Sequence, residues 1–281
     1  MSFQFTVPPD SVERQLALTA LAKAHLAHGD RVAAVDLARA ALRLDHRCFA
    51  AHLLLAEVAL AGEPYSHLLK RVHEHFRPRT YIEIGIQFGM TFTLAGADTL
   101  AIGVDPAPQV EDRLPPNARI FAMTSNEFFA SHDLRKELAG KPLDIGLIDG
   151  MHLFEYALRD YINLERNSVP ETTILLHDCY PLDEMTSARQ RATEFWTGDV
   201  WKLIVCLKKY RSDLQIHTLA APPSGLVVIR RLNPASTVLS EQFDAICKEF
   251  VPMPYAALQP DKRDALNLVP GDWETARRLL E

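Results

Sequence analysis

The feature that most constrains the fold is a regular alternation, from residue 81 onward, of short β-rich runs with amphipathic segments. Strands that alternate with helical patterns are typical of a parallel sheet covered by helices. Between two of these runs, apolar residues at helical spacing from Phe154 to Tyr161 predict a crossover helix. The chain is therefore predicted to be an α/β protein, with strands over residues 81–84, 100–104, 118–122, 143–148 and 173–176.

Two later runs, residues 214–219 and 225–230, are separated only by the sequence AAPPS. This gap is too short for a parallel crossover, so the two runs are predicted to form an antiparallel hairpin at the sheet edge. The pattern turns helical again after Pro234. We therefore expect a sheet domain over residues 76–233 and a helical tail over residues 234–281 that packs on it.

Residues 1–75 are predicted to form a separate helical segment, with three helices and a break at Gly29-Asp30. The segment resembles a tetratricopeptide repeat, because Leu21 and Ala22 precede that turn and Ala41 follows it at the family's spacing. Only about one and a half repeats are present, too few to bury their apolar faces. The segment must therefore pack on the rest of the chain or on a second copy in a homodimer. A helical cap and a partner-binding repeat both remain open.

Charge and apolar patterning exclude several classes of protein. The chain of 281 residues carries 30 Lys and Arg against 36 Asp and Glu, so its formal charge of −6 would repel a nucleic acid backbone. The longest apolar stretch, residues 48–61, is interrupted by His52 and Glu57 and is too short to span a membrane. The N-terminus lacks the ordering of a secretory signal, and the four scattered cysteines form no C-x-x-C pair. We expect a cytoplasmic protein with no nucleic acid or membrane partner.

A glycine-rich turn follows the first predicted strand, with the sequence E-x-G-x-x-x-G from Glu83 to Gly89, and is predicted to open a helix. The next strand ends at Asp105, and an acid at that place can accept the hydroxyls of a ribose. The dinucleotide fingerprint needs a third glycine, so an NAD-dependent oxidoreductase is disfavoured. The pattern fits an adenosine ligand that need not carry phosphates.

Over residues 81–232 the sequence resembles the class I S-adenosylmethionine-dependent methyltransferases, through YIEIGIQFG, VDPAP and MTSNEFF. IDGMHLFEYALRD and LLHDCYP are similar to a bacterial branch that includes sugar and antibiotic O-methyltransferases. The resemblance implies a doubly wound, Rossmann-like sheet that binds S-adenosylmethionine. It implies that Gly85 and Gly89 shape the cofactor turn and that Glu83 places the methionine end of the cofactor. It also implies that Asp105 binds the ribose and that Thr124 or Ser125 lies at the adenine.

Asp149 and Asp178 end the fourth and fifth predicted strands, which a sheet of this kind places side by side. Two adjacent carboxylates repel unless a cation or a shared proton intervenes, and Mg²⁺ or Ca²⁺ suits such ligands. The resemblance also implies a divalent metal on these two acids. We include His177 as a third candidate ligand, although neither it nor Cys179 is the usual oxygen donor. The alternative is that both carboxylates orient the hydroxyls of a substrate directly.

His152 lies three residues after Asp149 and is predicted to face the same crevice. A histidine titrates near neutral pH and can remove a proton from a hydroxyl group, although a residue at a helix start can equally bond solvent or backbone. The predicted catalytic residues are His152, Asp149 and Asp178, and we interpret Trp196 as core or lid. The sequence predicts methyl transfer to an oxygen of a small hydroxylated acceptor such as a sugar unit. The alternative is a cofactor-binding interaction protein without turnover that docks partners through its N-terminal helices.

Overall fold

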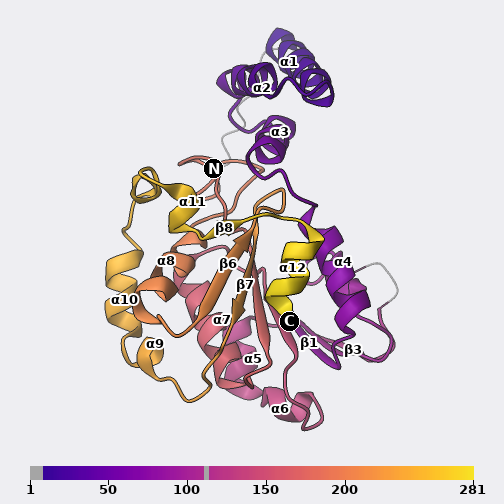
Figure 1. Ribbon diagram of the computed structural model, residues 1–281, viewed down its shortest axis with the longest axis vertical. Helices are drawn as coiled ribbons and strands as arrows, with labels where there is room; N and C mark the ends of the chain where they lie inside the picture. The colour runs from indigo at the N-terminus through magenta and orange to yellow at the C-terminus, as the bar shows by residue number, and fades with distance from the viewer. Residues whose placement is uncertain (1–8, 111–113) are drawn as a thin grey trace.

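The computed structural model describes residues 9–110 and 114–281. Its centre is an eight-stranded sheet with the order β3-β2-β1-β4-β5-β7-β6-β8 (Figure 1). The strands from β1 to β5 are mutually parallel, and β7 runs antiparallel to both of its neighbours. The strands are β1 (Thr80–Ile84), β2 (Leu100–Val104), β3 (Ala118–Phe121), β4 (Ile145–Ile148), β5 (Thr173–His177), β6 (Gln215–Leu219), β7 (Leu226–Arg230) and β8 (Leu268–Val269).

The predicted fold class is confirmed by this topology. Each strand predicted from a β-rich run is present, and β6 and β7 form the predicted antiparallel hairpin. The structure adds one strand that the sequence did not predict, because β8 lies in the helical tail and pairs with β6 over two residues. A strand of two residues carries no alternating pattern that a sequence could reveal.

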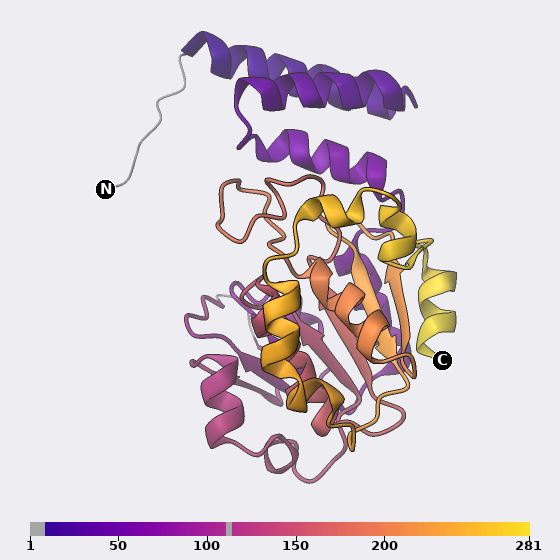
Figure 2. The same ribbon diagram turned by 90° about the vertical axis from the view of Figure 1, so that its left-hand side faces the viewer.

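Helices cover both faces of the sheet, as the views in Figures 1 and 2 show. Alternate residues of a strand point to opposite faces, so Ile82 packs in one core cluster and Tyr81 in the other. The first face is covered chiefly by α5 (Ser125–Ser131), α7 (Phe154–Arg166), α8 (Trp201–Tyr210) and α10 (Phe243–Phe250). The second is covered by α4 (Tyr65–Phe76), the 3-10 turn η1 (Phe92–Leu94) and α12 (Trp273–Leu280). The short elements α6 (Leu134–Glu137), α9 (Val238–Glu241), η2 (Tyr255–Leu258) and α11 (Lys262–Ala265) connect these layers.

The connection from β1 to β2 differs from the sequence prediction. The glycine-rich turn was expected to open a helix, but the only helical element there among the described residues is η1, a single 3-10 turn. The segment after the turn contains Thr91 and Thr93, whose branched side chains favour a helix poorly, and Gly96 interrupts it. The face that such a helix would cover is occupied by α4, which packs beside η1 in the same core cluster.

Three N-terminal helices stand above the sheet: α1 (Pro9–Ala27), α2 (Arg31–Leu44) and α3 (Phe49–Ala59) (Figure 2). Their shared core is built mostly from alanine, namely Ala22, Ala38, Ala41 and Ala51, with Leu54. The helix nearest the sheet is α3, whose His52 stacks on Phe195 with the ring centroids 5.6 Å apart. Residues 1–8 of the predicted segment lie outside the described residues.

The chain just before α4 is tied to the sheet by backbone hydrogen bonds. The N–H of Gly62 donates to Ala220 O at 3.0 Å, and the N–H of Glu63 donates to Gly271 O at 2.8 Å. Leu68 of α4 is completely buried against the sheet. We therefore propose that the sheet domain begins near Gly62, ahead of the predicted boundary at residue 76. Among the described residues, no helix has both the length and the apolar character needed to cross a membrane.

Candidate active site

The site lies where four parallel strands end at the same edge of the sheet. Gly85, Asp105, Asp149 and Asp178 directly follow β1, β2, β4 and β5. The chain goes from β1 to its neighbour β2 on one side, whereas β4 pairs with β1 on the other side. The crevice beyond this reversal of strand order is the place where open α/β sheets bind their ligands.

The two glycines of the turn are required by close packing and by backbone conformation. Gly85 has φ +86°, and a Cβ there would overlap the carbonyl group of Asp149 on the neighbouring strand end. Gly89 has φ +77°, and a Cβ there would press against the side chain of Val110 at 2.8 Å. Gly85 therefore brings the turn close to the end of β4 and Gly89 brings it against Val110, and any contact that they make with a cofactor would be additional.

Asp105 holds the glycine turn through backbone hydrogen bonds. Its Oδ2 accepts from the N–H groups of Ile86 at 3.0 Å and Gln87 at 2.9 Å. Its Oδ1 accepts from the N–H of Ala107 at 2.7 Å. A carboxylate has about four acceptor positions, so Oδ1 keeps one for a further donor such as a ribose hydroxyl.

Glu83 is completely buried, and its carboxyl group is bound by two hydroxyl groups. Tyr81 donates to Oε2 at 2.6 Å and Thr91 donates to Oε1 at 2.5 Å. Burial raises the pKa of Glu83 to about 8, although both hydrogen bonds oppose this rise. Side-chain hydroxyls therefore supply both donors to this buried carboxyl group. Its predicted contact with the methionine end of a cofactor stays a prediction.

Ser125 begins α5, which follows β3 in the chain, and Thr124 directly precedes that helix. Thr124 is the N-cap residue: its Oγ1 accepts from the N–H of Glu127, and the Glu127 carboxylate accepts from the N–H of Thr124. This capping box explains the sequence T-x-x-E at this position. It fixes the loop that the resemblance assigns to the adenine, while the assignment itself stays a prediction.

Asp160 on α7 was missed by the sequence analysis. It is 3% exposed, and its Oδ1 has no hydrogen-bond partner among the described residues. Burial raises the pKa of Asp160 to about 7, although a hydrogen bond from the Ser125 side chain opposes this rise. Its position in the sequence could have identified it as a candidate site residue. Asp160 lies three residues after Ala157 on the apolar side of the crossover helix, where an acid is unusual.

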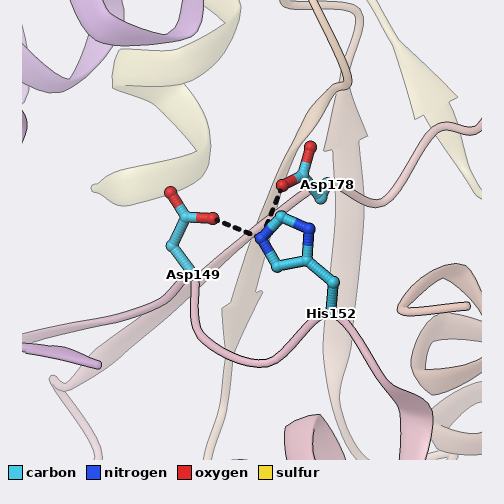
Figure 3. Close-up of side chains that lie close together, drawn as sticks. All are labelled: Asp149, His152 and Asp178. Carbon is cyan, nitrogen blue, oxygen red and sulfur yellow. Dashed lines mark ion pairs between the residues drawn. The ribbon is translucent and has the colours of Figure 1, made fainter. Parts of the chain in front are cut away.

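Asp149, His152 and Asp178 converge in the crevice, as Figure 3 shows. The Nε2 atom of His152 lies 3.0 Å from Oδ2 of Asp178 and 3.6 Å from Oδ1 of Asp149. Each residue offers one ligand atom, and the three atoms lie within 4.8 Å of one another. The structure therefore brings the three predicted catalytic residues together.

His177 lies beneath this cluster with both ring nitrogens occupied. Its Nδ1 is 3.2 Å from Oδ1 of Asp149, and its Nε2 is 3.0 Å from the hydroxyl of Ser224. The ring of Tyr65 stacks on it with the centroids 3.8 Å apart. His177 is therefore outside the group that could hold a metal, where His152 takes the third place. Tyr65 and Ser224 were not predicted, because they approach from α4 and from the β6–β7 connection.

Charge pairing sets the protonation of the cluster. Burial favours neutral imidazoles, but the carboxylates of Asp178 and Asp149 outweigh it and raise the pKa of His152 to about 9 and that of His177 to about 10. Burial also disfavours the carboxylates, yet the two histidines lower the pKa of Asp149 and of Asp178 below the usual value. The protonated rings of His152 and His177 thus offset the repulsion between the carboxylates of Asp149 and Asp178. From the sequence, a metal cation or a shared proton was expected to do this.

The loop between β5 and α8 holds His152 in position. Trp196 stacks on the imidazole with the centroids 5.2 Å apart, and its carbonyl oxygen lies 3.2 Å from Nδ1. A Cβ at Gly198 would overlap the carbonyl oxygen of His152, so only glycine allows the two segments to approach so closely. The N–H of Asp199 donates to that same oxygen at 3.1 Å. Trp196 therefore acts as a wall against the predicted base.

A second layer of charged residues anchors this loop. The carboxylate of Asp199 is 1% exposed and pairs with Lys202 at 2.8 Å and with Arg189 at 2.7 Å. Its other oxygen accepts from the N–H of Phe154, the first residue of α7. A buried carboxylate with three such partners gives the loop one defined arrangement against the crossover helix.

The reversal of strand order, the glycine turn and the acid after β2 define a Rossmann-like nucleotide-binding domain. Residues 82–179 match the model of a family described as "Methyltransferase domain". The match runs from β1 to just beyond β5 and includes the glycine turn and all three predicted catalytic residues. The resemblance to methyltransferases is therefore confirmed over this part of the chain.

The chain is also similar to several solved structures. A putative O-methyltransferase from Klebsiella pneumoniae is 15% identical with a TM-score of 0.44, and the alignment covers 65% of this chain and 88% of that one. An O-methyltransferase from Bacillus cereus in complex with SAH is 10% identical with a TM-score of 0.45, covering 59% and 80%. The O-methyltransferase TomG from Streptomyces achromogenes, in complex with SAM, is 12% identical with a TM-score of 0.44, covering 60% and 80%. No curated protein matches the chain.

Proposed function

We propose that the protein transfers a methyl group from S-adenosylmethionine to an oxygen of a small hydroxylated acceptor, such as a sugar unit. The observation that carries this proposal is the convergence of Asp149, His152 and Asp178 at the carboxyl edge of a methyltransferase domain. Bound S-adenosylmethionine would supply a methyl group on a positively charged sulfur. Carboxylates that accept hydrogen bonds from the acceptor would align its oxygen with that methyl group.

Several groups around the crevice fit the cofactor. Asp105 keeps one acceptor position for a ribose hydroxyl while it holds the glycine turn. Asp160 offers an unpartnered carboxyl oxygen beside Ser125, which the resemblance places near the adenine. A group with a pKa of about 7 can donate or accept a hydrogen bond near neutral pH. These features support an adenosine ligand laid across the ends of β1, β2 and β4.

The acceptor hydroxyl must lose its proton when the methyl group leaves sulfur for oxygen, and His152 is the group that can take it. The sequence analysis expected this base to titrate near neutral pH, but Asp178 and Asp149 raise the pKa of His152 to about 9. Only the neutral imidazole can accept a proton, so the free enzyme holds His152 mostly in its inactive form at pH 7. We therefore expect turnover to rise with pH up to about 9.

The same cluster is suited to a divalent cation. Asp149 and Asp178 would supply oxygen ligands and His152 a nitrogen ligand, a donor set that magnesium, manganese or zinc can use. A bound cation would lower the pKa of an acceptor hydroxyl. The imidazole of His152 must lose its proton before it can bind a metal, so metal binding should strengthen as the pH rises.

The test measures release of S-adenosylhomocysteine from S-adenosylmethionine with a panel of monosaccharides and simple phenols. His152→Ala should lower acceptor-dependent release by about 10² to 10⁴, the usual contribution of a general base, and leave cofactor affinity nearly unchanged. The matched control is His28→Ala, an exposed histidine in the turn that follows α1. Turnover of His152→Ala within about threefold of the wild type would remove His152 from the mechanism.

The same assay separates enzyme from interaction protein and tests the cation. Cofactor binding by calorimetry without acceptor-dependent release from any member of the panel would favour the alternative without turnover. If a cation is required, chelation with EDTA should abolish release and magnesium should restore it. Activity that is indifferent to both treatments would leave Asp149 and Asp178 with the role of orienting the acceptor directly.

A further inference from the structure

A second cavity lies away from the crevice, between the N-terminal helices and the loop after β5. Its volume is about 560 Å³, within the range of small-molecule sites, and its walls come from α2, α3 and that loop. The apolar part of the lining consists of Val35, Leu42, Leu55, Val58, Ala59, Leu182 and Met185. None of the residues assigned to the cofactor or to catalysis lines this cavity.

The cavity carries a positive rim. Arg39 and Arg43 of α2 and His46 just beyond it line the cavity and are exposed. Within the described part of the chain, the side chain of neither arginine makes a hydrogen bond or an ion pair. The opposing charge in the lining is Asp183, whose carboxylate already accepts a hydrogen bond from the N–H of Thr186. Two unpaired guanidinium groups at one cavity would attract an anionic group.

His52 supplies an independent indication of a ligand. It lines the cavity from α3, it is 1% exposed, and its Nδ1 has no hydrogen-bond partner among the described residues. Burial lowers the pKa of His52, although the Asp183 carboxylate and the backbone carbonyl of Cys48 oppose this shift, so the neutral imidazole is favoured. A buried polar atom without a partner is costly, and a ligand in the cavity could provide the missing hydrogen bond.

We propose that this cavity binds an amphipathic organic anion, a small molecule with an apolar body and one terminal carboxylate or phosphate. The apolar walls would cover the body, and Arg39 and Arg43 would pair with the anionic group. The inference is independent of the proposed methyl transfer, because the two sites share no lining residue. The same loop nevertheless borders both, since Phe195 stacks on His52 and the next residue, Trp196, stacks on His152.

The experiment is calorimetric titration of the full-length protein with octanoate, with 1-octanol and acetate as matched probes. Octanoate should bind saturably with one site per chain. The alcohol lacks the charge and acetate lacks the apolar body, so both should bind at least about tenfold more weakly. Octyl phosphate in place of octanoate shows which head group the arginines prefer. Failure of octanoate and octyl phosphate to bind, or equal binding of 1-octanol, would overturn the proposal.

Three variants locate the binding. The double variant Arg39→Gln with Arg43→Gln should weaken octanoate binding by about tenfold or more, because hydrogen bonds to a charged group are lost. Val58→Phe, which fills the cavity, should also weaken it. Arg135→Gln on α6, at the opposite end of the molecule in Figure 1, removes an exposed arginine and should leave binding unchanged. Octanoate binding that survives both cavity variants would place the ligand elsewhere and refute the site.

Discussion

The packing of Gly198 against His152 allows a sharp test of how the base is positioned. In Gly198→Ala the new Cβ would overlap the carbonyl oxygen of His152, and the backbone of residue 198 would be held at φ +57°. The strained backbone costs an alanine about 1–2 kcal/mol. Because the obstructing atom belongs to the backbone, the loop must also move, which breaks the hydrogen bond from Asp199 and the stack of Trp196 on His152. Losing these contacts should add about 2–3 kcal/mol.

Gly140→Ala is the matched control for this variant. Gly140 has φ +78°, but a Cβ there would meet nothing within 4 Å, so that substitution carries the backbone strain alone. Urea denaturation should show a loss of about 1–2 kcal/mol for Gly140→Ala and about 3–5 kcal/mol for Gly198→Ala. Equal losses in the two variants would refute the argument that the loop is pressed against His152. The readout needs no acceptor, so it does not depend on the proposed function.

Three further results are expected. Asp105→Ala should weaken S-adenosylhomocysteine binding by about 10-fold or more in calorimetry, and unchanged affinity would contradict the ribose assignment. A fragment of residues 1–61 should give no cooperative melt as a monomer, because its core is mostly alanine; a sharp monomeric transition would show that the helices fold alone. Because the pKa values of His152 and His177 are raised in the folded state, protonation of these residues stabilises that state. This stabilisation is complete below about pH 6.5 and is lost as the pH rises through about 9 to 10. The melting temperature should therefore fall over that range, with a smaller fall in His152→Gln, and identical profiles would be inconsistent with the charge pairing.

The strands could be predicted from the sequence because each is a short β-rich run bounded by turn residues. The position of Asp149 and Asp178 followed from that, since parallel strands end at one edge of a sheet. The protonation of the cluster could not be predicted in the same way. It depends on the distances from His152 to two carboxylates, one of which comes from a separate strand. A linear pattern contains no such distances.

Other parts of the site were hidden by sequence separation. Tyr65 reaches His177 from α4, although residue 65 was predicted to belong to the separate N-terminal segment. Gly198 showed no special pattern, because the need for glycine arises only from the approach of the His152 backbone. The helix expected after the glycine turn is absent from the described residues because α4 and η1 fill that face, which a pattern confined to the turn does not reveal.

The hydrogen bonds that join Gly62 and Glu63 to Ala220 and Gly271 have a consequence for synthesis on the ribosome. The proposed start of the sheet domain is held by Ala220 and Gly271, which are synthesised long after it. Until β8 emerges, β6 exposes one unpaired edge, and exposed strand edges promote association between nascent chains. Chains whose synthesis stops before β8 should therefore need a chaperone, even though all three predicted catalytic residues have already been made.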